Sequence, residues 1–144
     1  MARMSGGDKL RAVLGRISQK AKGGVNVGFL KGATYPDGTS VAQVAFWNEY
    51  GTSKTEARPF FRTMIAVESF AWPGLMGKAL VHYNYDGATV MQFMGVKVSE
   101  ELQQSIAGWR YPGNAPSTIA KKGFDKPLVE TAHMQNSVGF EVLE

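Results

Sequence analysis

The segment Val90–Ile106, VMQFMGVKVSEELQQSI, decides the fold because it has the clearest helical periodicity in the chain. Its apolar residues recur at intervals of four: Val90, Met94, Val98, Leu102 and Ile106. Side chains at this spacing share one face of an α-helix, which other parts of the protein must cover. The opposite face is expected to be solvated and to carry Glu100, Glu101, Gln103 and Gln104. The segment therefore predicts an amphipathic helix that packs on the core.

Two short segments near opposite ends of the sequence alternate apolar with small or polar residues, as half-buried strands do. They are Gly24–Leu30, GVNVGFL, and Val138–Leu143, VGFEVL. Their apolar faces consist of Val25, Val27 and Phe29, and of Val138, Phe140 and Val142. We predict that the two strands pair in a small antiparallel sheet and that the 90–106 helix packs on it. The predicted fold class is α+β, with several helices packed on the sheet.

The remaining helices are predicted from their boundary residues. Ser40 can cap a helix over Val41–Tyr50 that Gly51 closes. Pro59 favours the start of a helix that runs to about Ala71. In this helix the residues at helical spacing are Phe61, Met64, Ile65 and Glu68. Pro73 then breaks or restarts the helix, and a second helical stretch ends near Tyr83. Later segments predict a loop over Gly108–Pro116, a helical turn over Pro116–Lys122 and a short helix from Lys126 to about Ser137.

Length and composition predict one globular domain over residues 1–144. The chain has 144 residues, of which 44% are hydrophobic and 19% are charged. These values are typical of a folded domain and not of a disordered chain. The absence of cysteine from the sequence excludes disulfides and thiolate chemistry. We find neither an apolar run long enough to span a membrane nor an apolar signal segment, and so expect a protein that acts in a cytoplasm or in a particle assembled there.

Positive charge is concentrated at the start of the chain. Residues 1–22 hold six basic residues and one acidic residue, a net charge of +5, whereas the remainder sums to −1. A basic amphipathic helix is predicted over about residues 5–22, with Ser5 as its N-cap near Asp8 and an apolar stripe made by Leu10, Val13, Leu14 and Ile17. Such a helix could bind nucleic acid, an anionic surface or an acidic partner. The favoured interpretation is a docked terminal helix with a solvated cationic face.

No arrangement of residues points to catalysis. The two histidines, His82 and His133, lie far apart in the sequence and have no metal-ligand spacing. Glu100 and Glu101 are adjacent, so on a helix they point in different directions and do not form a catalytic pair. We therefore predict that the protein is not an enzyme and that it has no catalytic, cofactor-binding or metal-binding residue.

The segment between residues 47 and 62, WNEYGTSKTEARPFFR, predicts an exposed loop between two helices. Loops fixed at both ends often carry recognition, and aromatic residues and arginine are enriched at interfaces. We therefore predict a subunit or partner interface made by Glu49, Tyr50, Gly51, Thr52, Lys54, Glu56, Arg58, Pro59, Phe60 and Phe61. Glu49 and Arg58 are expected to pair across the base of the loop. The alternative is an ordinary connecting loop, with both phenylalanines in the core of the subunit.

Two separated blocks of this sequence resemble a known family. The first is VAQVAFWNEYGTSKTEARPFFRTMI, residues 41–65, and the second combines TIAKK, residues 118–122, with KPLVETAHMQNSV, residues 126–138. Together they resemble the N-E-[FY]-G-T, a-R-P-F-[FL]-R, T-I-x-x-K and K-P-L-[IV]-[DE]-T-G-x-[LM]-x-x-S-[IV] patterns of neck and tail-completion proteins of long-tailed bacteriophages, which include the group similar to the lambda minor tail protein Z. Ala132 departs from this pattern, which has glycine there.

The resemblance implies a small α+β virion protein that acts by assembly and not by catalysis. It implies a closed ring, with six copies favoured, that completes or terminates the tail and joins it to the head. The expected partners are other copies of the chain, adjacent neck, connector or tail-tube proteins and, through non-specific contact, packaged DNA, with no membrane. Such a protein is assembled in the host cytoplasm and resides in the virion neck or tail. The alternatives are a small basic nucleic-acid-binding protein and an enzyme with scattered carboxylates.

Overall fold

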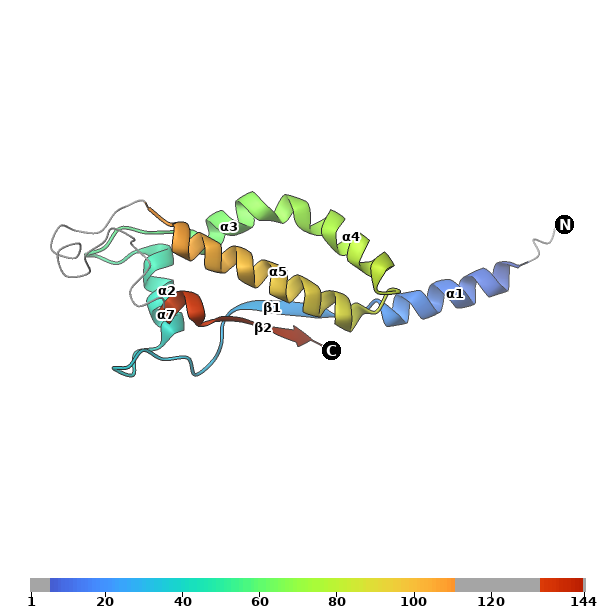
Figure 1. Ribbon diagram of the computed structural model, residues 1–144, viewed down its shortest axis with the longest axis horizontal. Coiled ribbons are helices and arrows are strands. Elements are labelled where there is room, and N and C mark those ends of the chain that lie inside the picture. Colours follow the sequence, from blue (N-terminus) through green and yellow to red (C-terminus); the bar gives the residue numbers. More distant parts are fainter. Residues whose placement is uncertain (1–5, 111–132, 144) are drawn as a thin grey trace.

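The computed structural model describes residues 6–110 and 133–143, and its elements form an α+β fold (Figure 1). In chain order they are α1 (Gly7–Lys20), β1 (Gly24–Phe29), α2 (Val41–Tyr50), α3 (Phe60–Glu68), the 3₁₀ turn η1 (Ser69–Ala71), α4 (Trp72–His82), α5 (Gly87–Gly108), α7 (His133–Asn136) and β2 (Val138–Leu143). The predicted helical turn at 116–122, the start of the helix predicted from Lys126, and Ala132 lie outside the described residues.

Strands β1 and β2 form a two-stranded antiparallel sheet, as predicted. The register places the apolar residues directly opposite one another: Val25 with Val142, Val27 with Phe140, and Phe29 with Val138. Because all six side chains belong to the same alternating set, they give the sheet one apolar face. Two segments more than one hundred residues apart in the sequence thus lie side by side in one sheet.

Helix α5 covers the sheet and is the centre of the core. Figure 1 shows α5 between the two strands and the arch formed by α3 and α4. The predicted stripe is buried at every position: Val90, Met94, Val98, Leu102 and Ile106. The helix lies close to the sheet at Gly95, where an added Cβ would lie 2.6 Å from Cγ of Phe140. The prediction that this helix packs on the sheet is therefore confirmed.

The polar face of α5 differs from the prediction at Glu101. This residue is buried, and its carboxylate accepts a hydrogen bond of 2.8 Å from Nε1 of Trp72 and lies 3.6 Å from Nζ of Lys97. A buried carboxylate requires such partners to offset its lost hydration. The predicted solvated position was wrong because helix α4 lies against this side of α5 and brings an indole donor to it.

The helix predicted from Pro59 to Ala71 is interrupted. Pro59 is the N-cap of α3, which ends at Glu68, and a 3₁₀ turn leads into α4, with Pro73 in its first turn. Proline is tolerated there because its missing N–H has no helical partner in any case. The buried side chains of α3 are Phe60 and Met64. Of the positions predicted at helical spacing, Met64 is therefore buried, whereas Phe61 is half-buried and Ile65 is exposed. Of the two predicted effects of Pro73, a break or a restart of the helix, the structure shows the restart, because α4 begins at Trp72.

Helix α1 does not dock on the body of the protein, and the favoured interpretation of this segment was wrong. It begins at Gly7 with Gly6 as its N-cap and without a side-chain cap, whereas Ser5 lies outside the described residues. None of residues 7–20 is buried, and Figure 1 shows α1 extending away from the other elements. The periodicity correctly predicted an amphipathic helix, but residues 6–110 and 133–143 do not cover its apolar stripe.

The close approach of α5 to the sheet can be tested by replacing Gly95 with alanine. We expect Gly95→Ala to lower the free energy of unfolding by about 1–3 kcal/mol, because the new methyl group must displace the Phe140 ring. Urea denaturation measures this change. The matched control is Gly77→Ala in α4, where an added Cβ meets nothing within 4 Å and higher helix propensity stabilises by about 0.5–1 kcal/mol. Equal stabilisation by both substitutions would contradict the packing described.

Candidate functional site: a groove between α2 and α3

Helix α2 has the boundaries that its sequence predicts. Oγ of Ser40 accepts a hydrogen bond of 3.4 Å from the backbone N–H of Gln43, so Ser40 is the N-cap. Gly51 ends the helix with a φ of 77°, a left-handed conformation that favours glycine. A Cβ at Gly51 would also lie 2.9 Å from the backbone nitrogen of Ala57. Glycine is therefore required here both by its conformation and by the close return of the chain.

The loop from residue 51 to 58 is folded tightly, with its charged side chains outside. The backbone N–H of Thr52 donates to the carbonyl of Thr55 at 2.8 Å, and that of Arg58 donates to the carbonyl of Asn48 at 2.5 Å. The side chains of Lys54 and Glu56 are exposed. The loop is thus a fixed projection that presents charge, as the sequence predicted.

Glu49 links α2 to the start of α3. Its carboxylate is buried and accepts hydrogen bonds from the backbone N–H groups of Phe61, at 2.9 Å, and Arg62, at 3.0 Å. These N–H groups belong to the first turn of α3, where they have no helical acceptor and the helix dipole favours negative charge. Because Pro59 gives no side-chain cap, Glu49 acts as the cap of α3 from the neighbouring helix.

The ion pair of Glu49 is with Arg62 and not with Arg58, so the predicted pair was wrong. Nε of Arg62 lies 2.8 Å from Oε1 of Glu49, and its Nη2 donates to the backbone carbonyl of Glu49 at 3.0 Å. Nη1 of Arg58 instead donates to Oδ1 of Asn48 at 3.4 Å. The reason is geometric: the carboxylate is directed at the helix start, and Arg62 lies on that same turn.

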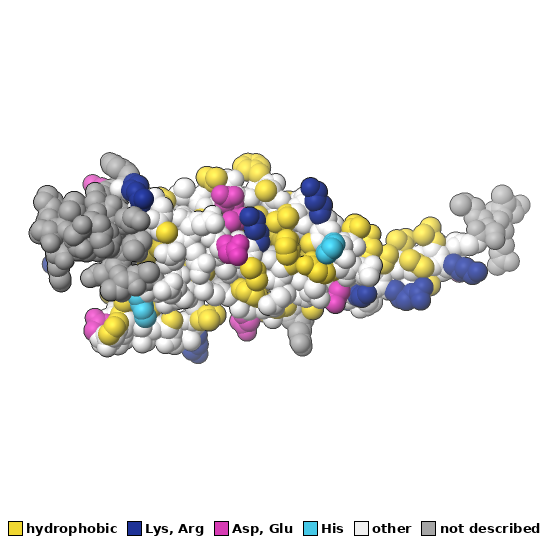
Figure 2. Space-filling model, viewed as in Figure 1, with side chains coloured by type: hydrophobic (Ala, Val, Ile, Leu, Met, Phe, Trp, Pro, Cys, Tyr) yellow, Lys and Arg dark blue, Asp and Glu magenta, His cyan; other side chains and the backbone are white. Residues whose placement is uncertain are grey.

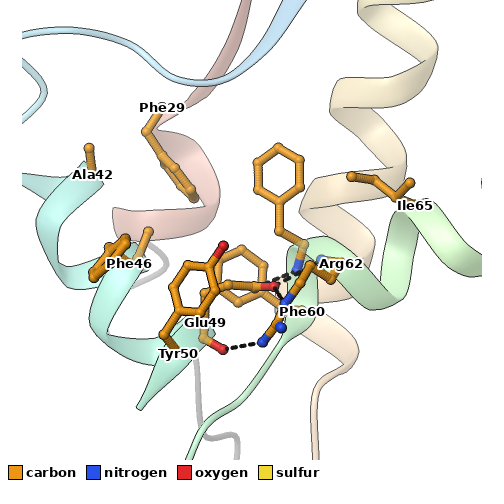
Figure 3. Close-up of a pocket in the computed structure, with 10 residues that line it drawn as sticks. Phe29, Ala42, Phe46, Glu49, Tyr50, Phe60, Arg62 and Ile65 are labelled. Atoms are coloured by element: carbon orange, nitrogen blue, oxygen red, sulfur yellow. Dashed lines mark hydrogen bonds and ion pairs between the residues drawn. The ribbon is translucent and has the colours of Figure 1, made fainter. Parts of the chain in front are cut away.

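The Arg62 guanidinium also fixes an aromatic wall. It lies 4.7 Å from the centre of the Tyr50 ring, a cation–π distance, and the Tyr50 ring lies 4.8 Å from that of Phe46. Figure 3 shows Glu49, Tyr50 and Arg62 together at the junction of the two helices. Glu49 therefore helps to position the exposed aromatic side chains of α2, because it holds Arg62, which contacts Tyr50, which in turn contacts Phe46.

A groove of about 350 Å³ runs between α2 and α3. Its walls are Ala42, Phe46 and Tyr50 on one side and Phe61, Arg62 and Ile65 on the other, and Figure 3 shows Phe29 from β1 beside them. Phe46 and Tyr50 are 56% and 57% exposed, and Ile65 is 40% exposed. Large apolar side chains gathered around a mainly apolar groove are typical of a protein-binding surface.

The structure divides the predicted interface residues into three groups. Tyr50 and Phe61 line the groove where a partner could touch them, whereas Glu49 and Phe60 are buried and support it. Phe60 packs edge-to-face on Phe29 and is 1% exposed, so it belongs to the core, which is the alternative that the sequence left open for it. The rest of the prediction forms the loop next to the groove and the cap of α3: Gly51, Thr52, Lys54, Glu56, Arg58 and Pro59.

Six residues that line the groove were not among the predicted interface residues: Phe29, Ala42, Ala45, Phe46, Arg62 and Ile65. Helical spacing could have found two of them, because Phe46 lies four residues before Tyr50 and Ile65 four residues after Phe61. The sequence analysis placed Ile65 at helical spacing with Phe61 but did not assign it to the interface.

Other features of the described residues add no second chemical site. Nε2 of His133 lies 2.6 Å from the carbonyl oxygen of Thr34 and its ring packs on Tyr35, whereas His82 is in the last turn of α4. Residues 6–110 and 133–143 contain no group of three histidine or acidic side chains placed to hold a metal ion. Over the same ranges, the helices are too short or too polar to cross a membrane.

Comparison of the chain with family models, with curated proteins and with solved structures gives no match.

The capping role of Glu49 predicts a stability difference between two carboxylates. We expect Glu49→Gln to lower the free energy of unfolding by about 1.5–3 kcal/mol, because a buried charged acceptor of two N–H groups and a guanidinium is lost. Glu56→Gln, in the exposed loop, is the matched control and should change it by less than about 0.5 kcal/mol. Both are measured by urea denaturation, and equal effects would exclude the cap.

Proposed function

We propose that this chain is a structural subunit of the neck or tail end of a long-tailed bacteriophage, where its copies form a ring that completes the tail and joins it to the head. The observation that carries the proposal is the groove between α2 and α3, with its exposed Phe46, Tyr50 and Ile65. All the residues that line the groove except Phe29 lie within the first of the two sequence blocks that resemble the neck and tail-completion family, residues 41–65.

The proposed ring is a homo-oligomer, with six copies favoured by the family resemblance. One surface of each copy contacts a different surface of the next, an arrangement that closes into a ring when the rotation between copies permits. A subunit of this size can bury a standard interface of about 1,600 Å² with each neighbour. The charged loop from residue 51 to 58 stands beside the groove, where it contacts the adjacent subunit or an adjacent neck, connector or tail-tube protein.

Particle assembly tests this function directly. Deleting the coding sequence of this chain from the phage genome that carries it should leave filled heads and separate tails, and supplying the chain should restore joined particles. The Phe46→Gln variant should restore few or none, because it removes a large apolar side chain that is 56% exposed at the groove. Val81→Gln, an exposed apolar residue of α4, is the control and should restore them fully.

Electron microscopy counts joined particles, and plaque counts give infectivity. Joined particles in the absence of the chain would reject the proposed function. Full restoration by Phe46→Gln would show that the groove is not the assembly surface. If the chain stands as a single copy in the assembled neck, the proposed ring is wrong.

A second candidate, a nucleic-acid-binding protein, is favoured by one observation: the basic side chains of α1 are all exposed. The structural role predicts only weak, non-specific binding to double-stranded DNA, with a dissociation constant of about 10⁻⁶–10⁻⁴ M at physiological salt. A fluorescence anisotropy titration at several salt concentrations measures this. Binding in the nanomolar range at physiological salt, lost on replacing Arg11, Arg16 and Lys20 with glutamine, would instead establish nucleic acid as the main partner.

A further inference from the structure

Helix α1 is an arm whose apolar stripe is uncovered. Leu10 and Leu14 are 60% and 55% exposed, and Val13 and Ile17 complete the stripe. Figure 2 shows hydrophobic side chains along one side of the arm and basic side chains along the other. An isolated helix of 14 residues is only marginally stable in water. The arm therefore gains most from a surface that covers its stripe.

The direction of the arm is fixed at its base. A Cβ at Gly87, the first residue of α5, would lie 2.9 Å from the carbonyl oxygen of Lys20 and 2.8 Å from the carbonyl carbon of Ala21. Gly23 has a φ of +148°, and a Cβ there would lie 3.2 Å from Cγ of Met91. Backbone thus packs directly on backbone where α1 meets α5. Folding the arm back over its own body would require this junction to open.

The arm and the groove lie at opposite ends of an elongated molecule. Figure 1 places α1 at one end of the long axis, and α2 with the start of α3 at the other, beyond the length of α5. The stripe cannot reach the groove of its own chain. Any contact between the two surfaces must therefore join different copies.

The spacing of the stripe matches what a groove between helices accepts. Its residues stand at i, i+3, i+4 and i+7, the pattern of an amphipathic helix that docks in an apolar groove. The groove offers apolar walls from two helices, with Phe46 and Ile65 exposed on opposite sides. The apolar stripe of the arm and the apolar walls of the groove can therefore bury each other.

Charge decides between two ways of pairing the copies. Residues 1–22 carry a net +5 and the remainder −1, so two arms repel each other, whereas an arm and a body attract. At the groove, the charge of Arg62 is offset by Glu49. Glu68, one turn beyond Ile65 on α3, makes no ion pair with any residue in the described ranges and can receive a lysine or arginine of the arm.

We infer that the arm of one copy docks in the α2–α3 groove of the next copy, head to tail. Leu10, Val13, Leu14 and Ile17 enter the groove against Phe46, Tyr50 and Ile65, while the basic side chains remain outside. The inference rests on the proposed function in that it names the occupant of the proposed ring interface. Because the two contacting surfaces differ, every copy has one arm to donate and one groove to fill.

Cysteine cross-linking tests this contact, because the native chain contains no cysteine. A chain carrying both Leu14→Cys and Ile65→Cys should form disulfide-linked oligomers under mild oxidation, since the arm of one copy lies beside the groove of another. A chain carrying Leu14→Cys and Val81→Cys is the matched control and should give at least tenfold less cross-linked product. Equal cross-linking of the two pairs, or none in either, overturns the inference.

Sedimentation of complementary variants tests the head-to-tail order. A variant with Leu10→Gln and Leu14→Gln lacks the apolar stripe of the arm but keeps the groove. The Phe46→Gln variant lacks one apolar wall of the groove but keeps the arm. Each variant alone should therefore self-associate at least tenfold more weakly than the native chain. Mixed together, they should form a one-to-one dimer, because one intact arm and one intact groove remain. Circular dichroism confirms that both are folded. A mixture that stays monomeric, or a native chain that is monomeric at all concentrations, overturns the inference.

These results separate the inference from the proposed function. Failure of cross-linking with normal restoration of joined particles by the native chain rejects the arm as occupant and retains the neck role. If the cross-link forms but the chain has no role in particle joining, the contact between arm and groove is retained and the neck role is rejected. Binding of the arm to anionic vesicles or to DNA that requires Leu10 and Leu14, with no cross-link to the groove, identifies another occupant and overturns the inference.

Discussion

The carboxylate of Glu49 holds α2 against the start of α3, and the arrangement of the candidate site depends on that contact. It accepts two N–H groups from the first turn of α3 and the Nε–H of Arg62. Arg62 then contacts the Tyr50 ring, and next to it Gly51 ends α2 in the left-handed conformation that turns the chain into its tight loop. A buried charge is costly unless it is paired in this way, so the helix junction has little freedom to shift and the groove keeps a defined shape.

The core gives this junction a fixed base. Helix α5 packs its apolar stripe on a sheet whose two strands come from opposite ends of the sequence. Oγ of Ser105 on α5 donates to the carbonyl of Phe60 at 2.8 Å, and the Phe60 ring packs on Phe29 from β1. The start of α3, which forms one wall of the groove, is therefore held by contacts with both α5 and β1. A partner that enters it meets a surface already in place, which lowers the ordering cost of binding.

Sequence periodicity predicted the parts of the fold whose partners are set by pattern alone. The α5 stripe and the paired faces of Val25, Val27 and Phe29 follow from helical and strand spacing. The polar contacts of the site could not be predicted in this way, because each depends on which helix lies alongside: Glu49 chooses Arg62 over Arg58, and Trp72 buries Glu101. The stripe of α1 shows the same limit, since periodicity predicts that a face needs cover but not which molecule supplies it.

An elongated subunit with its basic apolar helix at one end and its apolar groove at the other is suited to directional assembly. If arms paired with arms, contact would bring together two regions of net charge +5, and like charges at close range oppose binding. Pairing arm to groove avoids this repulsion and covers two exposed apolar surfaces with one contact. Such a contact leaves a free arm and a free groove at the ends of every chain of copies, so only ring closure satisfies all of them.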